Sequence, residues 1–253
     1  MDNHKIDKMT QAGNILGQVL EESLKFVSPG ITEIEIDKFS QKKIEEKGGF
    51  PGFKRVPGYK NTICASTNSV VVHGIPGPRR LVRGDVFGID CGVYLDGYHT
   101  DMAETIVVGG KGSVEVEKFL KVGKNALFEA IKQAKPGNRV GHISKKMQEI
   151  VEKEGYSIVR NLVGHGVGKE LHEKPEIPGY LLGKLEKTPI LKVGMTIAIE
   201  VIYNMGDREV VYDGHDDWTL MTEDGSISGL FERTVLIEKT GPKLLTRLST
   251  DPM

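Results

Sequence analysis

The chain has 253 residues, of which 34 are basic and 35 acidic, giving a formal net charge of −1. This length fits one large domain or two fused halves and is sufficient to bury a substantial core. The near-neutral charge gives no electrostatic reason to expect nucleic acid or an anionic membrane as the main partner.

The first half of the chain begins with two predicted helices. Apolar residues recur on one face of residues 5–27, and the Ser-Pro-Gly sequence that follows would end that helix. Thr32 begins a second helix, in which Glu35, three positions later, completes a capping box. Residues 49–60 (GFPGFKRVPGYK) are rich in glycine and proline and are predicted to form a loop.

Strands follow this loop. Short strands are predicted near residues 62–66 and 69–73, and longer ones over Val86–Tyr94 and Tyr98–Val108. The two longer strands flank Asp96-Gly97, a dipeptide strongly preferred in two-residue turns. These two strands should therefore form a β-hairpin.

The hairpin register has a chemical consequence. A two-residue turn pairs Leu95 with Tyr98 and places Asp101 opposite Gly92. Asp90 shares the face of Gly92, so Asp90 and Asp101 would project together as diagonal neighbours, about 7–8 Å apart at Cα. Carboxylates in this arrangement can hold metal ions between them.

The second half repeats this mixture of helices and strands. Helices are predicted near residues 114–134 and 140–154. Strands are predicted near residues 157–163, 195–203, 208–212, 217–222 and 229–238. The fold class is therefore α+β, with a curved, largely antiparallel sheet and helices packed on one face.

The two halves also resemble each other in sequence. Residues 28–48 match residues 135–155, and residues 81–90 match residues 191–200. The second match aligns Asp90 with Glu200. Each half, approximately 1–110 and 111–253, therefore contributes a helix pair and a strand with a carboxylate. The simplest arrangement is a pseudo-symmetric pair around one central site.

Four carboxylates and one histidine lie in or beside apolar or glycine-rich stretches. They are Asp90, Asp101, His165, Glu200 and Glu232. An unpaired carboxylate on a buried strand is costly or changes its pKa, so the set predicts a site for two divalent cations. Mixed oxygen and nitrogen ligands suit Co, Mn, Fe or Zn. A hairpin with two ordinary surface aspartates is the alternative, but it does not explain Glu200.

Over nearly its whole length the chain resembles type I methionine aminopeptidases. The motifs are VVHGIP (71–76), GIDCGVYLDGYHTD (88–101), GHGVGKELHEKP (164–175), GMTIAIE (194–200) and FERT (231–234). The resemblance implies the α+β pita-bread fold, with pseudo-two-fold halves and helices on the outer face of the sheet, in one catalytic domain over residues 1–253. It also implies the removal of N-terminal methionine from nascent proteins and peptides whose second residue is small, by a metal-bound hydroxide.

The resemblance assigns roles to the five predicted ligands. Asp90 would chelate one metal ion, and Asp101 and Glu232 would bridge both. His165 and Glu200 would complete the site of the other ion. A monovalent cation held by carbonyl oxygens of Asn68, Val70 and Ser228 is also implied, with ordinary turn hydrogen bonding as an equal alternative.

Catalytic and substrate-binding residues follow from the same resemblance. Glu200 would accept a proton, His172 would donate to the developing oxyanion, and His73 would contact the scissile nitrogen or the substrate backbone. For both histidines the alternative is a structural role. An apolar methionine pocket would use Cys64, Tyr59, Leu171 and Trp218, with Phe50 or Phe53; for these residues, Leu171 above all, the alternative is core packing.

The chain departs from the family pattern at three places. Val201 replaces the usual proline after Glu200, Arg233 replaces the usual histidine after Glu232, and the 49–60 loop is longer than usual. Alternation along a strand predicts that Arg233 points to the face opposite Glu232, so it should affect the surroundings of the metal ligands more than the ligands themselves.

The sequence also bears on partners and location. Two cysteines, no apolar signal segment and no membrane-spanning run predict a cytoplasmic monomer with no membrane partner. A basic run could touch ribosomal RNA transiently, but a solvated surface with no specific nucleic acid is favoured; it comprises Lys54, Arg55, Lys60, Arg79 and Arg80.

Two alternative functions remain open. A prolidase or aminopeptidase P would share the fold, but such chains usually carry a large extra N-terminal domain. A binding module that has lost catalysis would be expected to lack at least one metal ligand, and all five are present here.

Overall fold

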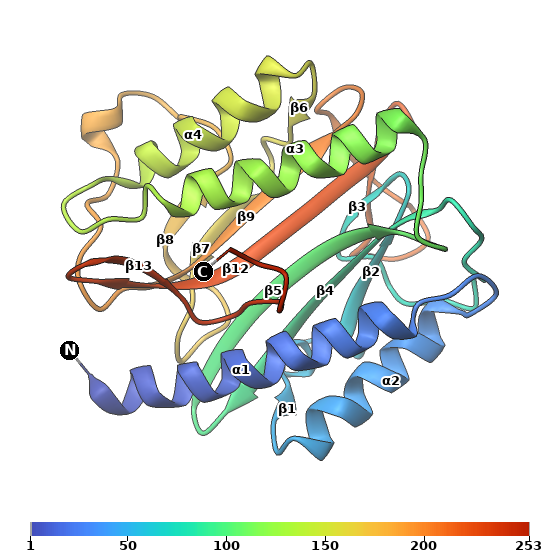
Figure 1. Ribbon diagram of the computed structural model, residues 1–253, viewed down its shortest axis with the longest axis horizontal. Helices are drawn as coiled ribbons and strands as arrows, with labels where there is room; N and C mark the ends of the chain where they lie inside the picture. Colours follow the sequence, from blue (N-terminus) through green and yellow to red (C-terminus); the bar gives the residue numbers. More distant parts are fainter. Residues whose placement is uncertain (1, 253) are drawn as a thin grey trace.

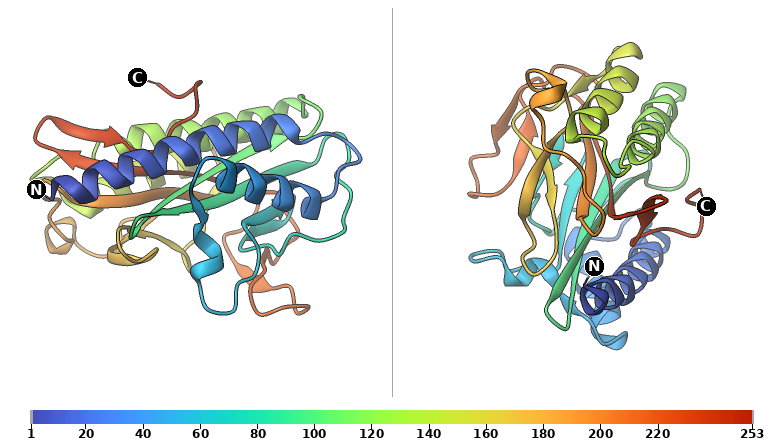
Figure 2. Two further views of the ribbon diagram at one scale, coloured as in Figure 1. Left: turned by 90° about the horizontal axis from the view of Figure 1, so that it is seen from below. Right: turned by 90° about the vertical axis from the view of Figure 1, so that its left-hand side faces the viewer.

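The computed structural model describes residues 2–252 and places four α-helices over one face of a curved sheet (Figure 1). The first half contributes α1 (Asn3–Phe26) and α2 (Glu33–Glu46), and the second half contributes α3 (Val114–Ile131) and α4 (Val140–Lys153). The side and end views of Figure 2 show all four helices on the same side of the sheet. The predicted α+β architecture is confirmed.

The main sheet has ten strands with antiparallel pairing throughout. Its path runs β1 (Phe50–Pro51), β4 (Val86–Leu95), β5 (Tyr98–Val107), β12 (Ser228–Glu238), β9 (Thr196–Asn204), β7 (Val163–Gly166) and β8 (Glu173–Pro178). Off this path, β2 (Ile63–Thr67) pairs with β4, β6 (Ser157–Ile158) with β9, and β13 (Gly241–Leu244) with β12. A separate small sheet contains β3 (Val70–Val72), β11 (Leu220–Thr222) and β10 (Val210–Tyr212).

Local signals in the sequence set several element boundaries as predicted. The Thr32–Glu35 capping box is present at the start of α2. The hairpin turns at Asp96 and Gly97, whose φ angles are 46° and 97°, the left-handed region that such turns need. Asp101 consequently lies opposite Gly92, in the predicted register.

Other segments differ from the prediction. Residues 49–60 are not simply a loop, because Phe50–Pro51 pairs with β4 and Gly52–Arg55 forms a 3-10 helix. The strand predicted over 157–163 is confined to Ser157–Ile158. The Glu173–Pro178 strand was not predicted because its two prolines argue against a strand on sequence grounds.

Each half has its own apolar core between helices and sheet. In the first half, Leu16, Ile36 and Phe87 are fully buried where α1 and α2 cover β2 and β4. In the second half, Phe119 and Ile143 are fully buried where α3 and α4 cover β9 and β12. Burying a large apolar side chain contributes about 1.5–3 kcal/mol, so each half is stabilised largely by its own helices. The halves join where β5 lies beside β12.

Candidate metal centre

Three of the five predicted metal ligands lie in one row across the strands, which the strand register sets. One row of directly opposite residues crosses five neighbouring strands, from β2 through β4, β5 and β12 to β9. The row comprises Cys64, Asp90, Ala103, Glu232 and Glu200. Directly opposite side chains share a face of the sheet, so the three carboxylates converge, and the small Ala103 side chain leaves space between them.

The remaining two ligands lie one pleat away on the same face. Asp101 is two residues before Ala103, and His165 lies opposite Ala198, two residues before Glu200. His165 Nε2 is 3.9 Å from Asp101 Oδ2 and 4.0 Å from Glu232 Oε1. Ligand atoms of these three buried residues all lie within 4.8 Å of one another, a spacing compatible with one shared cation.

His165 is oriented for ligation by its own chain neighbour. Its Nδ1 atom is 2.9 Å from the Gly166 carbonyl oxygen, which can only accept, so Nδ1 carries the proton. The Nε2 lone pair therefore faces the carboxylates. Burial, together with the nearby His172 ring, lowers the pKa of His165 to about 4. The ring is thus neutral at physiological pH, which is the form that binds metals.

The carboxylates are strongly perturbed by their surroundings. Burial raises the pKa of Asp101 to about 7, and burial with repulsion from Asp101 raises the pKa of Glu200 to about 8. Burial and mutual repulsion raise the pKa of Asp90 and of Glu232 well above the ordinary range. Among residues 2–252, Asp90 Oδ1 and Glu232 Oε1 are buried and have no hydrogen-bond partner. Divalent cations would satisfy these oxygens and offset the repulsion, so the residues fit the predicted metal centre.

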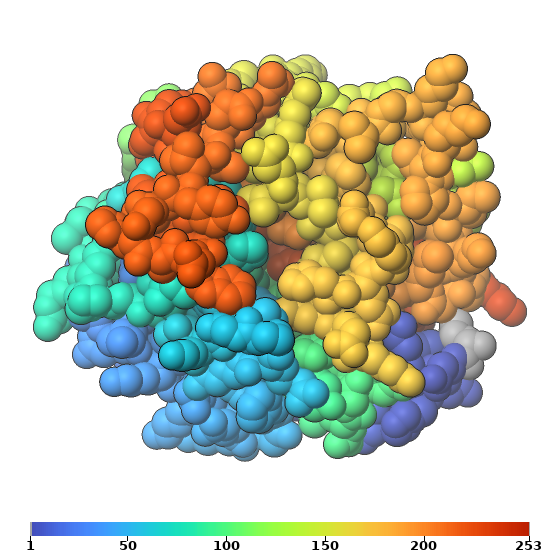
Figure 3. All heavy atoms as spheres, turned by 180° about the vertical axis from the view of Figure 1, so that it is seen from behind, coloured from blue at the N-terminus to red at the C-terminus, as the bar shows by residue number. Residues whose placement is uncertain are grey.

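A cavity of about 250 Å³ opens above this row of ligands. The space-filling view shows a hollow on the face opposite the helices, where segments near residues 55, 165 and 215 meet (Figure 3). The predicted residues that line it are Phe53, Tyr59, Cys64, His73, Asp90, Asp101, His165, Leu171, His172, Glu200, Trp218 and Glu232. The structure therefore brings together all five predicted ligands, both histidines predicted to act in catalysis, and the predicted pocket residues other than Phe50.

The apolar end of the cavity is walled by aromatic rings. Tyr59 packs edge-on against Trp218, with ring centres 5.1 Å apart, and against Phe53 at 6.2 Å. Its hydroxyl donates to the Ile63 carbonyl oxygen at 2.7 Å, which fixes the ring. Of the two candidate phenylalanines, Phe53 lines the cavity, whereas Phe50 is 47% exposed.

Some lining residues were missed from the sequence. They are Val56, Val72, Asn161, Leu162, Val163 and Ile202. Val72 and Ile202 could have been inferred, since Val72 precedes His73 and Ile202 lies two positions beyond Glu200 on the same face. Nothing in the sequence marks residues 161–163 as a cavity wall, because only the path of the chain into β7 brings them there.

His73 and His172, the two histidines predicted to contact the substrate, lie in different backbone settings. His73 follows β3 with a φ of 57°, a left-handed conformation that is uncommon outside glycine. The His172 ring centre is 4.4 Å from that of His165. Burial lowers the pKa of both His73 and His172, with a further contribution from His172 at His73. Both are therefore predominantly neutral near pH 7 and can act as hydrogen-bond donors.

The two strand residues that differ from the usual family sequence, Val201 and Arg233, face away from the cavity. Val201 lies opposite Phe231 in the second-half core. Arg233 is fully buried and bonds to groups on the helix side of the sheet, which confirms the predicted orientation.

The residues expected to hold a monovalent cation lie outside the cavity. Asn68 has a φ of 56°, and its carbonyl oxygen accepts the Ser228 N–H at 2.8 Å. This backbone contact between distant segments brings two of the three residues together. A cation bound by Asn68, Val70 and Ser228 stays a prediction.

Comparison with known proteins shows which family this chain belongs to. The sequence pattern of metallopeptidase family M24 matches residues 7–239. The chain belongs to this metallopeptidase family. It is 44% identical over 240 residues to methionine aminopeptidase 1 of Bacillus subtilis, covering 95% of each chain. The predicted resemblance to methionine aminopeptidases is thereby confirmed.

Solved structures of the family agree with this placement. The methionine aminopeptidase of Thermotoga maritima is 38% identical, covers 98% of both chains and superposes with a TM-score of 0.94. The prolidase of Pyrococcus furiosus is 24% identical with a TM-score of 0.78, and this chain covers 65% of its length, so that likeness shows the fold alone. Within residues 2–252, no helix is both long and apolar enough to cross a bilayer.

Proposed function

We propose that this protein removes the N-terminal methionine from nascent proteins and peptides whose second residue is small. The proposal rests on one observation: two features lie side by side in the same cavity. A cluster of buried metal-type ligands forms its floor, and an apolar slot walled by Tyr59 and Trp218 adjoins it. A flexible thioether side chain fits such a slot, and sulfur packs favourably beside aromatic rings.

The ligands would hold two divalent ions, with Asp101 and Glu232 shared between them. Asp90 would complete one site, and His165 and Glu200 the other. The ions would supply Lewis acidity and acidify a bound water when present. Co, Mn, Fe and Zn all suit this donor set, and we propose that any of them supports activity.

The side chains above the ligands would bind and orient the peptide. Glu200 would hold the proton released from the attacking water and pass it toward the leaving nitrogen. His172 would donate to the carbonyl oxygen as negative charge develops on it. His73, held in its left-handed conformation, would contact the scissile nitrogen or the substrate backbone.

Partners and location form part of the same proposal. The substrates would be the N-termini of nascent polypeptides in the cytoplasm. The enzyme would act as a monomer. Its single catalytic domain, residues 1–253, would combine the halves 1–110 and 111–253. The predicted ligands come from both halves, which supports a single domain.

The predicted basic surface is engaged in contacts within the chain. The Arg55 guanidinium lies 3.9 Å from the centre of the Tyr94 ring, and Arg79 lies 3.3 Å from Asp85. These contacts support a solvated basic surface, with at most transient ribosome contact.

A peptide panel tests the activity. Chelator-stripped protein is reloaded with one metal at a time and assayed on Met-Ala-Ser, acetyl-Met-Ala-Ser, Ala-Ala-Ser and Leu-Pro-Ala. Met-Ala-Ser should be cleaved. The acetylated peptide should resist because it lacks a free amine. Ala-Ala-Ser should be roughly ten- to a hundredfold poorer, because it forfeits about 1.5–3 kcal/mol of side-chain burial. Cleavage of Leu-Pro-Ala in preference to Met-Ala-Ser would instead favour the prolidase alternative.

A further inference from the structure

The two halves of the molecule meet at a short seam between β5 and β12. This seam carries the carboxylates of Asp101 and Glu232. Its ladder comprises two residue pairs, Glu232 with Ala103 and Arg233 with Met102, against ten pairs between β4 and β5 and nine between β12 and β9. Backbone pairing alone therefore fixes the relative position of these two ligands less firmly than it fixes positions within each half.

Threonine hydroxyls replace the missing backbone bonds on both sides of the seam. Thr234 Oγ1 accepts the Asp101 N–H at 2.9 Å and donates to the Asp101 carbonyl oxygen at 2.8 Å. Thr105 Oγ1 donates to the Leu230 carbonyl oxygen at 2.7 Å and accepts the Leu230 N–H at 3.0 Å. The strands are thus joined by side chains where they diverge.

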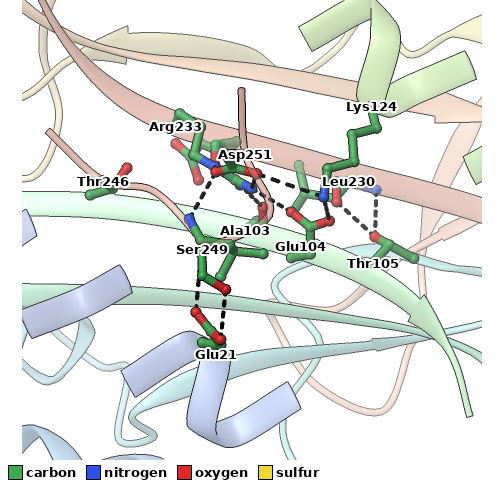
Figure 4. Close-up of polar contacts among 12 residues, drawn as sticks. Glu21, Ala103, Glu104, Thr105, Lys124, Leu230, Arg233, Thr246, Ser249 and Asp251 are labelled. Atoms are coloured by element: carbon green, nitrogen blue, oxygen red, sulfur yellow. Dashed lines mark hydrogen bonds and ion pairs between the residues drawn. The ribbon is translucent and has the colours of Figure 1, made fainter. Parts of the chain in front are cut away.

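Arg233 joins the strands at the position of Glu232 itself. Its Nη1 atom donates to the Ala103 carbonyl oxygen at 2.9 Å (Figure 4). The same atom donates to the Glu232 carbonyl oxygen at 2.7 Å. These two residues are direct partners across the seam. One nitrogen therefore holds both strands immediately behind the Glu232 carboxylate.

The guanidinium is itself fixed by two carboxylates. Asp251 accepts from Nε at 2.7 Å and from Nη2 at 2.9 Å, while Glu104 accepts from Nη2 at 2.5 Å. Lys124 of α3 lies 2.7 Å from Glu104 and 3.7 Å from Asp251 (Figure 4). Two positive and two negative charges balance within this cluster, so Arg233 acts on Glu232 mainly through position.

The segment that delivers Asp251 is closely fitted against α1. A Cβ on Gly13 would lie 2.1 Å from the Leu245 carbonyl oxygen, and a Cβ on Gly17 would lie 2.3 Å from that of Arg247. Further along, the Ser249 N–H and hydroxyl both bond to the Glu21 carboxylate, at 3.1 and 2.9 Å. The C-terminal segment is therefore held from the first half of the chain while Asp251 holds a strand of the second half.

We propose that Arg233 is a positioning residue for Glu232, and that Asp251 in the C-terminal segment keeps it in place. The inference rests on the proposed dinuclear metallopeptidase function. Through these contacts the end of the chain fixes the distance between the carboxylates that would bridge the two ions. Weakening the contacts of Arg233 should loosen metal binding without removing any ligand. The close packing against Gly13 and Gly17 keeps the segment in place when the bonds between Glu21 and Ser249 are lost.

Two variants test the proposal by calorimetric titration of metal-free protein with Mn²⁺. Arg233→Lys keeps the charge, but its single nitrogen cannot bond to two carbonyl oxygens and two carboxylates together. Asp251→Asn keeps the shape and removes the charge that holds Arg233. Both should weaken Mn²⁺ binding, Arg233→Lys by about tenfold, as is typical when partners behind a ligand are lost. The exchange-coupled electron paramagnetic resonance spectrum of the paired Mn²⁺ ions should change as well.

Glu21→Ala is the matched control, because it removes both bonds to Ser249 but leaves Arg233 and Asp251 in place. It should lower the thermal midpoint and leave Mn²⁺ affinity unchanged. Wild-type affinity in a folded Asp251→Asn variant would overturn the proposal, as would equal weakening by Glu21→Ala. If Arg233→Lys does not fold, Asp251→Asn decides. Failure of the proposed function would appear separately, as wild-type protein that does not cleave Met-Ala-Ser.

Discussion

At the scale of single residues, burial gives each side chain of the site its chemical state. His165 and His172 are near neighbours, yet their positions differ. His165 shares ligand spacing with Asp101 and Glu232, whereas His172 lines the cavity outside that group. Both pKa values are lowered by burial, so both rings are neutral near pH 7. One is therefore suited to bind metal and the other to donate a hydrogen bond to a substrate.

This difference predicts the effect of His172→Ala. The variant should bind Mn²⁺ like the wild type, because no ligand is lost. Its kcat should fall by roughly 10²–10³-fold, because the variant removes the proposed donor to the developing oxyanion. Steady-state kinetics with Met-Ala-Ser and measurement of bound metal would check both. His215→Ala, on an exposed loop, is the control and should leave kcat unchanged. A loss of metal with unchanged kcat would contradict the assigned role.

At the scale of elements, the turn after β3 places His73. Gly74 packs so tightly that a Cβ would lie 2.1 Å from the Ala65 carbonyl oxygen and 2.9 Å from Val70 Cγ1. The Gly74 carbonyl oxygen also accepts the Ala65 N–H at 2.8 Å. The turn is thus fixed against β2, and the strained His73 conformation is maintained by its surroundings.

Gly74→Ala should therefore displace His73. Overpacking against backbone should destabilise the fold by about 1–3 kcal/mol. A shift of His73 by about 1 Å could lower kcat/KM on the order of a hundredfold. Gly77→Ala is the matched control in the same loop, since its nearest neighbour would be 3.7 Å away. Equal kcat/KM values for the two variants, measured at equal metal content, would show that the turn does not position the histidine.

At the scale of the whole molecule, the halves assemble a centre that either half alone would lack. Asp90 and Asp101 come from the first half, and His165, Glu200 and Glu232 from the second. Joining the halves buries these carboxylates together, which is why their pKa values rise. Assembly of the centre and its affinity for cations thus have the same physical origin.

The stability of metal-free protein should accordingly fall as pH rises from about 6.5 to 8.5. The pKa values of Asp101 and Glu200 are about 7 and about 8 in the folded protein, against roughly 4 in an unfolded chain. The folded state therefore holds protons that the unfolded chain has lost, and this stabilisation disappears as the groups ionise. The low pKa of His165, about 4, acts in the opposite direction only below about pH 6.5.

Thermal unfolding of chelator-treated protein across this pH range would measure the effect. Adding Mn²⁺ should restore most of the lost stability at the alkaline end, because the ions replace the protons. A Glu200→Gln variant should show a flatter dependence. A thermal midpoint that rises with pH in the metal-free wild type would be incompatible with buried, proton-holding carboxylates.

The sequence by itself determined the features that depend on short-range geometry. The Asp96-Gly97 turn sets the hairpin register, and strand alternation then puts Asp90 and Asp101 on one face. The same alternation turns Arg233 away from Glu232 on their shared strand. The α2 capping box is equally local. Because the turn type and the pleat fix these relations within a few residues, no distant contact is needed to predict them.

Only the tertiary structure decided what depends on contacts between distant segments. It placed Phe53, and not Phe50, in the wall of the cavity. It also formed a strand from residues 173–178, which contain two prolines. It also brought Asp251 to Arg233, a pairing with no trace in local sequence. The choices reflect packing and charge pairing in a buried interior, where the partner of each group is set by the path of the whole chain.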